Sequence, residues 1–192
     1  MLPLLERRVE VIEMMVLDMY SGLGGFSEAF VRDPDWDVLR IENNHLLADV
    51  PHTMIADVLT LNPSDFQCDL LLASPPCTEF SQGFAGPGPT ARRKGIDFKP
   101  NMDLVKCAVE WDRVIKPKYF LMENVVGSAK YFAEVGVKKI MTIGPFCLYG
   151  RFPSFEMPQG WSHSKTAPKE IEWDFKHPLR ANYRGKLPLE LS

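Results

Sequence analysis

The chain has 192 residues, of which 45% are hydrophobic and 24% are charged. This composition is that of one globular domain with a sizeable core, and it excludes a disordered chain. No apolar run approaches the ~20 residues that a membrane span needs. Residues 1–14 include acids and lack a continuous apolar core, which argues against a signal peptide.

The four cysteines are scattered without a CxxC pair or a Cys/His ligand spacing: Cys68, Cys77, Cys107 and Cys147. This pattern favours reduced thiols over a disulfide framework or a zinc site. We therefore expect no bound metal and a cytoplasmic protein. The cytoplasm would be that of a bacterium, or that of the host cell if a phage encodes the protein. Without a long apolar run, we also expect no membrane contact.

The net charge of −3 is unevenly distributed along the chain. Residues 1–115 hold 10 Lys and Arg against 18 Asp and Glu, whereas residues 116–192 hold 12 against 7. The basic part could face an anionic partner, together with the basic loop around residues 92–94. Solvated surfaces also produce such imbalances.

The first half of the chain begins with a strand, a glycine turn and a helix. Residues 2–13 alternate apolar and charged side chains and predict a short leading helix. Residues 14–20 predict a strand that runs into the glycine-rich stretch 21–25, and residues 26–30 have the pattern of a helix start. This is the first unit of a doubly wound sheet, and its glycines let the backbone approach a ligand closely. A plain strand-to-helix turn would also use them.

Two more predicted strands each end in an acid. Residues 37–42 end at Glu42, 17 residues beyond Gly25, and residues 54–56 are followed by Asp57. Glu42 is placed to accept hydrogen bonds from ribose hydroxyls, and Asp57 to accept one from an adenine amino group. Either acid alone is also explained as a solvated strand end. With the glycine turn, the two predict a nucleoside-binding site.

A fourth strand ends at a cysteine. The apolar run 70–73 predicts a buried strand that stops at the prolines of residues 74–76, and Cys77 follows at once. Ligands in open α/β sheets gather just past the carboxyl ends of the strands. A thiol there is placed to act as a nucleophile, and a buried structural cysteine is the alternative.

The stretch 82–100 contains four Gly, three Pro and four Lys or Arg. It is long for a structureless loop in a compact domain, which favours a mobile lid or a binding loop. A disordered excursion would have a similar composition.

The rest of the pattern continues the sheet. Residues 101–116 predict the clearest helix, and residues 119–122 predict a strand that ends at Glu123, one strand over from the cysteine. Residues 126–139 predict a helical return, and residues 140–152 a pair of strands.

Three segments resemble motifs of the DNA cytosine-5 methyltransferases. Residues 18–27 (DMYSGLGGFS) resemble the first motif of that family, residues 74–81 (SPPCTEFS) its nucleophile motif, and residues 123–125 (ENV) its Glu-Asn-Val motif. They occur in the family's order, and Glu42 and Asp57 fall where its cofactor acids fall. The resemblance covers about residues 14–127.

The resemblance implies a Rossmann-like α/β methyltransferase fold with a mostly parallel, doubly wound sheet. It implies S-adenosylmethionine as the cofactor and DNA as the substrate, methylated at carbon 5 of cytosine after Cys77 has attacked carbon 6. Glu123 would contact the ring N3 and the exocyclic amine, and the loop 82–100 would close over a flipped base. The implied cofactor residues are Asp18, Tyr20, Gly22, Gly24, Gly25, Glu42, Asp57 and Pro76, and the implied substrate residues are Ser81, Asn124, Arg92, Arg93 and Arg151.

The chain departs from the family pattern in three respects. Thr78 and Glu79 follow the cysteine where the family usually has Gln. There is no Gln-x-Arg-x-Arg motif, and Arg151 is the nearest substitute. Residues 151–192 leave no room for a target-recognition domain, so we expect one catalytic domain over residues 1–192, with recognition relaxed or supplied by a partner protein or an oligomer.

Three functional hypotheses follow from these patterns. The first is a minimal DNA cytosine-5 methyltransferase. The second is a cytosine-5 methyltransferase that acts on RNA or on a free cytosine nucleotide, which would explain an absent recognition module. The third is a non-catalytic subunit that binds cofactor or DNA within a methyltransferase complex.

Overall fold

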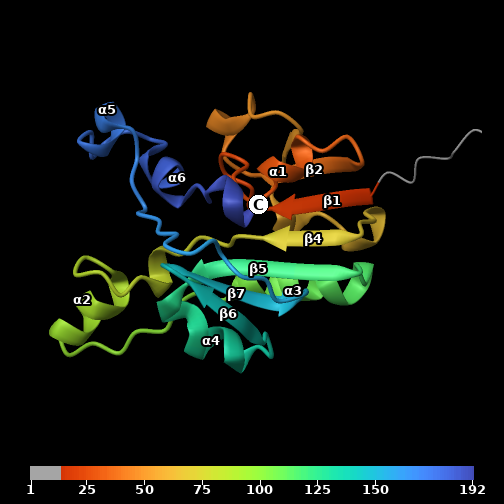
Figure 1. Ribbon diagram of the computed structural model, residues 1–192. Coiled ribbons are helices and arrows are strands. Elements are labelled where there is room, and N and C mark those ends of the chain that lie inside the picture. Colours follow the sequence, from red (N-terminus) through yellow and green to blue (C-terminus); the bar gives the residue numbers. More distant parts are fainter. Residues whose placement is uncertain (1–13) are drawn as a thin grey trace, which may run out of the picture.

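A computed structural model describes residues 14–192, and the short helix expected over residues 2–13 lies outside the described residues. The centre of the structure is a seven-stranded sheet in the order β3-β2-β1-β4-β5-β7-β6 (Figure 1). Its strands are β1 (Met14–Met19), β2 (Trp36–Glu42), β3 (Thr53–Ile55), β4 (Leu70–Ala73), β5 (Tyr119–Val125), β6 (Lys139–Ile143) and β7 (Phe146–Arg151). β7 runs antiparallel to both of its neighbours, and the other pairs are parallel.

Helices lie on both faces of this sheet and beyond the carboxyl ends of its strands (Figure 1). They are α1 (Glu28–Val31), α2 (Pro87–Arg93), α3 (Asp103–Ile115), α4 (Ala129–Glu134), α5 (Lys169–Glu172) and α6 (Arg180–Gly185). Single 3-10 turns lie at His45–Leu47, Val58–Thr60, Pro63–Asp65, Thr78–Phe80, Val126–Ser128 and Leu189–Leu191. The mostly parallel, doubly wound sheet expected from the sequence is confirmed.

The central strands are mostly apolar, as expected for strands with both faces buried. In β1, Leu17 and Met19 contribute to a core that includes residues of α3 and α4. Val16 points to the other face, where it joins a second core with Phe26 and with Leu191 near the carboxyl end. Side chains alternate between the faces of a strand, so Asp18 is buried on the same face as Val16.

The last residues of the chain return to the start of α1. Leu187 and Leu191 are buried, and the backbone N–H of Ala29 donates to the Ser192 hydroxyl at 2.6 Å. That hydroxyl in turn donates to the Phe26 carbonyl at 3.0 Å. The carboxyl-terminal segment, weakly patterned in the sequence, is therefore part of the layer that covers this face.

Two expected segments differ from the structure. The stretch 82–100 contains helix α2, with proline in its first turn, where the missing N–H breaks no helical bond. The helical return over 126–139 is shorter than expected. It consists of a 3-10 turn and α4, and Gly136 in the left-handed conformation (φ 79°) follows them.

The carboxyl ends of β1, β4 and β5 point to the side of the sheet where α2, α5 and α6 lie (Figure 1). Within residues 14–192, no helix is both long enough and apolar enough to span a membrane.

Candidate active site

A cavity of about 350 Å³ opens at the carboxyl ends of β1, β2, β4 and β5. Its walls come from the turn after β1, the ends of β2 and β3, the cysteine turn after β4 and the end of β5. The predicted site residues that line it are Tyr20, Gly22, Gly25, Glu42, Asp57, Pro76, Cys77 and Glu123.

The three glycines after β1 serve three different purposes. Gly22 (φ +55°) lines the cavity, and its N–H donates to the Glu42 carboxylate at 2.9 Å. A Cβ at Gly24 (φ +71°) would lie 2.3 Å from the Arg40 guanidinium carbon. A Cβ at Gly25 would lie 2.6 Å from the Leu187 carbonyl oxygen. Gly22 and Gly25 line the cavity, whereas Gly24 does not.

The Glu42 carboxylate is held rigidly at the end of β2. Besides the bond from Gly22, it accepts backbone N–H groups of Asn43 at 3.0 Å and Asn44 at 2.9 Å. Asp57 caps the following 3-10 turn by accepting from the N–H of Leu59 at 3.0 Å. Both carboxylates face the cavity as acceptors, which suits the hydroxyl and amino groups of a nucleoside.

Cys77 lies on the turn after β4 and precedes the 3-10 turn Thr78–Phe80. The buried Asn124 amide fixes this turn, because its Nδ2 donates to the Pro75 carbonyl at 2.8 Å. Burial raises the pKa of the Cys77 thiol, the nearby Lys165 ammonium lowers it, and the Glu123 carboxylate raises it. The position of the lysine therefore affects how readily the thiolate forms.

Glu123 lies one strand away on β5 and is 6% exposed. Its pKa is raised by burial and lowered by Lys165, whose Nζ lies 3.6 Å from the Glu123 Oε1. The ammonium also lies 4.6 Å from the centre of the Phe146 ring. Cys77, Glu123 and Lys165 all line the same cavity.

Two predicted cofactor residues lie beneath the cavity wall. Asp18 is fully buried, and its Oδ2 accepts from the Ser27 hydroxyl at 2.6 Å. Gly24 covers Arg40, whose Nη2 donates to the Gly24 carbonyl at 2.8 Å. The structure places both residues under the turn, outside the residues that line the cavity.

Three predicted substrate residues lie outside the cavity lining, one just after the 3-10 turn Thr78–Phe80 and two on α2. The Ser81 hydroxyl accepts from the N–H of Gly83 at 3.3 Å. Arg92 and Arg93 are exposed on α2. The guanidinium of Arg93 donates to the Phe84 carbonyl at 2.7 Å and lies 4.0 Å above the Phe84 ring.

Arg151 is not brought to the site. It pairs in β7 with Phe120, near the amino end of β5, at the opposite edge of the sheet from Cys77. Its guanidinium donates to the Asp112 carboxylate at 2.9 Å and to the Pro117 carbonyl at 2.8 Å. The structure does not bring Arg151 to the cavity, because the antiparallel direction of β7 carries its last residue away from it.

The structure adds residues to the cavity that the sequence did not single out. Most of them lie in the carboxyl-terminal part of the chain, and these are Lys165, Ala181, Asn182, Gly185, Lys186 and Leu187. The excess of basic residues over 116–192 was the one sequence signal there, and it does not identify a particular lysine. No group of three His, Cys, Asp or Glu within residues 14–192 could hold a metal ion.

Comparison with known proteins agrees with this geometry. Residues 14–141 match the family model of the C-5 cytosine-specific DNA methylases. The chain is 27% identical over 164 residues to the type II methyltransferase M.DdeI of Desulfomicrobium norvegicum, covering 71% of this chain and 37% of that protein. It is 26% identical over 180 residues to the type II methyltransferase M.NgoFVII of Neisseria gonorrhoeae, covering 85% and 46%.

Among solved structures, a SAM-dependent methyltransferase from Aquifex aeolicus aligns with a TM-score of 0.46 and 13% identity, covering 72% of this chain and 81% of that one. The chain spans less than half the length of the two curated relatives. The family match covers the glycine turn after β1, the cysteine turn after β4 and the end of β5, which meet at the cavity. The chain belongs to the C-5 cytosine-specific DNA methylase family.

Proposed function

We propose that the protein transfers a methyl group from S-adenosylmethionine to carbon 5 of cytosine in DNA through a covalent adduct with Cys77. The observation that carries the proposal is the shared cavity, in which a thiol and a buried carboxyl from adjacent strands face the glycine turn and Glu42. The thiol and the carboxyl are suited to attack and bind a cytosine ring, and the glycine turn and Glu42 are suited to bind a nucleoside cofactor.

The cavity fits a nucleoside cofactor in size and in chemistry. Its volume of about 350 Å³ lies in the usual range for a small-molecule site. Glu42 would accept from the ribose hydroxyls, Asp57 from the adenine amino group, and Gly22 would let the backbone approach. When bound, S-adenosylmethionine supplies an electrophilic methyl group.

Cys77 would activate carbon 5 of cytosine for methylation. Carbon 5 of cytosine is a poor nucleophile, and a thiolate that adds to carbon 6 pushes electron density onto carbon 5. Once carbon 5 is methylated, loss of its proton to a base expels the thiolate and restores the ring. A thiolate suits both steps because it is strongly nucleophilic and also leaves readily.

Glu123 would stabilise the negative charge that develops on the ring. Burial raises the pKa of this carboxyl, which favours the protonated form. A protonated Glu123 can donate a hydrogen bond to N3 of cytosine while its other oxygen accepts from the exocyclic amine. The same pair of contacts would distinguish cytosine from thymine.

The stretch 82–100 is proposed to close over the base. It follows the cysteine turn directly and exposes Arg92 and Arg93, which suit contacts with phosphates. A base in duplex DNA must leave the stack before the thiol can reach carbon 6.

Methyl transfer from labelled S-adenosylmethionine would test the proposal on duplex DNA, single-stranded DNA, RNA and dCMP in parallel. We expect labelled 5-methylcytosine in DNA for the wild type and for Cys107→Ser, and none for Cys77→Ser. Cys107 is a suitable control because its half-buried thiol lies outside the cavity lining. Activity that survives in Cys77→Ser would exclude the covalent mechanism, and labelling of RNA or dCMP alone would move the substrate away from DNA.

A further inference from the structure

The turn that faces the cofactor cavity has an irregular backbone. Three of its residues adopt positive φ, namely Tyr20 (60°), Gly22 (55°) and Gly24 (71°). Such conformations persist only where the surrounding structure holds them. The contacts that hold this turn therefore determine how it presents itself to a ligand.

Three consecutive residues of β2 provide these contacts. The carbonyl of Ile41 accepts from Ser21 N at 3.2 Å, and the carboxylate of Glu42 accepts from Gly22 N at 2.9 Å. The guanidinium of Arg40 donates to the Gly24 carbonyl at 2.8 Å. Glu42 lines the cavity and Arg40 does not, so Arg40 would act on a ligand only through the turn.

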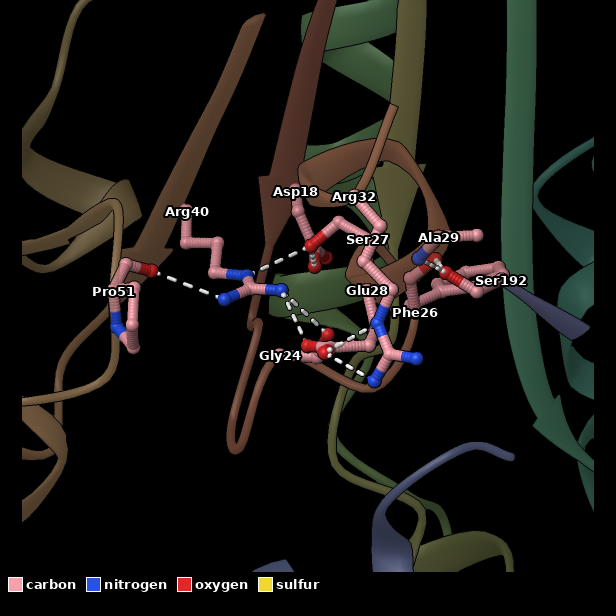
Figure 2. Close-up of polar contacts among 10 residues, drawn as sticks. All are labelled: Asp18, Gly24, Phe26, Ser27, Glu28, Ala29, Arg32, Arg40, Pro51 and Ser192. Carbon is pink, nitrogen blue, oxygen red and sulfur yellow. Dashed lines mark hydrogen bonds and ion pairs between the residues drawn. The ribbon is translucent and has the colours of Figure 1, made fainter. Parts of the chain in front are cut away.

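Arg40 is 1% exposed, and all three of its nitrogens have partners (Figure 2). Its Nε donates to the Ser27 hydroxyl at 2.8 Å and its Nη1 to the Pro51 carbonyl at 3.0 Å. Its Nη2 also lies 3.4 Å from the Glu28 carboxylate. A buried guanidinium is tolerated only when its donors are paired. Replacing a whole buried polar network by packed apolar residues is often neutral for stability, whereas removing the arginine alone leaves its partners unpaired. Stability alone therefore does not explain why an arginine occupies this position.

The contacts continue from β2 to β1 beneath the turn. The Ser27 hydroxyl accepts from Arg40 and donates to the Asp18 carboxylate at 2.6 Å (Figure 2). Asp18 is fully buried, and its Oδ1 has no hydrogen-bond partner within residues 14–192. Gly24 completes the arrangement, because any side chain there would collide with the guanidinium. A continuous network of hydrogen bonds thus connects the turn to both β1 and β2.

We propose that Arg40 is a positioning residue for cofactor binding, which it controls through the Gly24 carbonyl and Ser27. The inference rests on the proposed cofactor site. Arg40 holds the turn in the conformation in which Gly22 and Gly25 present their backbone to the cavity. Loss of the guanidinium releases the Gly24 end of the turn while Glu42 and its ligand contacts stay in place.

The test is the affinity of purified variants for S-adenosylhomocysteine, measured by calorimetry. Arg40→Met should weaken binding about tenfold or more, because it removes hydrogen bonds made by a charged group. Ser27→Ala should weaken it by a smaller factor. Arg40→Lys should lie between the wild type and Arg40→Met, because one ammonium cannot serve partners in several directions. Arg32→Met is the matched control, since Arg32 is exposed and contacts the same Glu28 from outside the turn.

A second control separates positioning from general stability. Phe132→Leu removes core volume under α4, away from the turn, and lowers the melting temperature without touching Arg40. We expect it to retain wild-type affinity, and we expect the KM for S-adenosylmethionine to rise in Arg40→Met while the KM for DNA is unchanged.

The outcomes distinguish failure of the positioning role of Arg40 from failure of the proposed methyltransferase function. Wild-type affinity in both Arg40→Met and Ser27→Ala would overturn the inference and leave the proposed function intact. Affinity losses that follow the melting temperature, Phe132→Leu included, would also overturn it. Failure of the wild type to bind S-adenosylhomocysteine would overturn the proposed function itself. If Arg40→Met does not fold, Ser27→Ala and Arg40→Lys still decide the matter.

Discussion

Lys165 Nζ lies 3.6 Å from the Glu123 carboxylate, in a cavity that Cys77 also lines. One ammonium therefore acts on two acids of the candidate site. Lys165 lies in the carboxyl-terminal part of the chain, beyond the family match over residues 14–141.

Replacing Lys165 should make the Cys77 thiolate harder to form. The ammonium lowers the pKa of the thiol against the effect of burial, so Lys165→Met should raise that pKa. Alkylation of Cys77 by iodoacetamide should then shift to higher pH, while Lys165→Arg should stay close to the wild type. Mass spectrometry of the Cys77 peptide separates this thiol from the other three. An unchanged alkylation profile in Lys165→Met would contradict the prediction.

Glu79 should restrain the far end of the stretch 82–100. Its carboxylate accepts a short hydrogen bond from the backbone N–H of Asn101, just beyond that stretch. Glu79→Ala should loosen the stretch, and trypsin should cleave faster at the exposed residues 92–94. Glu79→Gln should remain near the wild type, because an amide oxygen can accept the same bond. Asp97→Asn, in the same stretch, is the control, and equal cleavage of Glu79→Ala and wild type would refute the restraint.

Gly24→Ala should destabilise the protein more than Gly95→Ala does. Both glycines have positive φ, so alanine costs about 1–2 kcal/mol at either position. A Cβ at Gly24 would also collide with the Arg40 guanidinium, whereas among the described residues none approaches within 4 Å of a Cβ at Gly95 apart from its chain neighbours. The collision adds roughly 1–3 kcal/mol. Urea unfolding measures the difference, and equal losses in the two variants would show that Arg40 moves aside freely.

Asp18 should make the protein less stable as the pH rises. Burial is the main reason that the pKa of Asp18 is raised from 3.8 to about 7. The Ser27 hydroxyl and Arg40 lower this pKa, and Glu42 raises it further. The unfolded chain thus releases this proton near pH 3.8 and the folded chain near 7, and the free energy of unfolding falls through that window. The slope from one proton is at most about 1.4 kcal/mol per pH unit.

Asp18→Asn keeps the shape of the protonated side chain and removes its titration. The difference in unfolding free energy between wild type and Asp18→Asn should therefore change between pH 4 and pH 7. Asp33→Asn, an exposed acid near the end of α1, controls for general charge effects. A constant difference across that range would show that Asp18 is ionised throughout.

The sequence predicted those parts of the site whose positions follow from the adjacent strand in the sequence. The glycine turn directly follows β1, Cys77 follows β4 and Glu123 lies on β5, so alternation and strand ends were enough to place them. Parallel strands then bring their carboxyl ends together at one edge of the sheet.

The parts that the sequence missed depend on contacts between distant segments. Lys165 reaches Glu123 across 42 positions of the chain, in a stretch without a periodic pattern. Gly24 was interpreted as a cofactor residue because glycine turns approach ligands, but its space is taken by Arg40. The sequence near Arg151 did not reveal the antiparallel direction of β7, which places this residue away from the cavity.

The hydrogen bonds of Ser192 have a practical consequence for work on this protein. Its hydroxyl contacts both Phe26 and Ala29, at the point where the glycine turn becomes α1 (Figure 2). An affinity tag or reporter fused after Ser192 would therefore emerge beside the turn that lines the candidate cavity. Ligand-binding assays are better done with the tag at the amino end or removed, and a difference between the two tagged forms would itself measure how tightly this corner is packed.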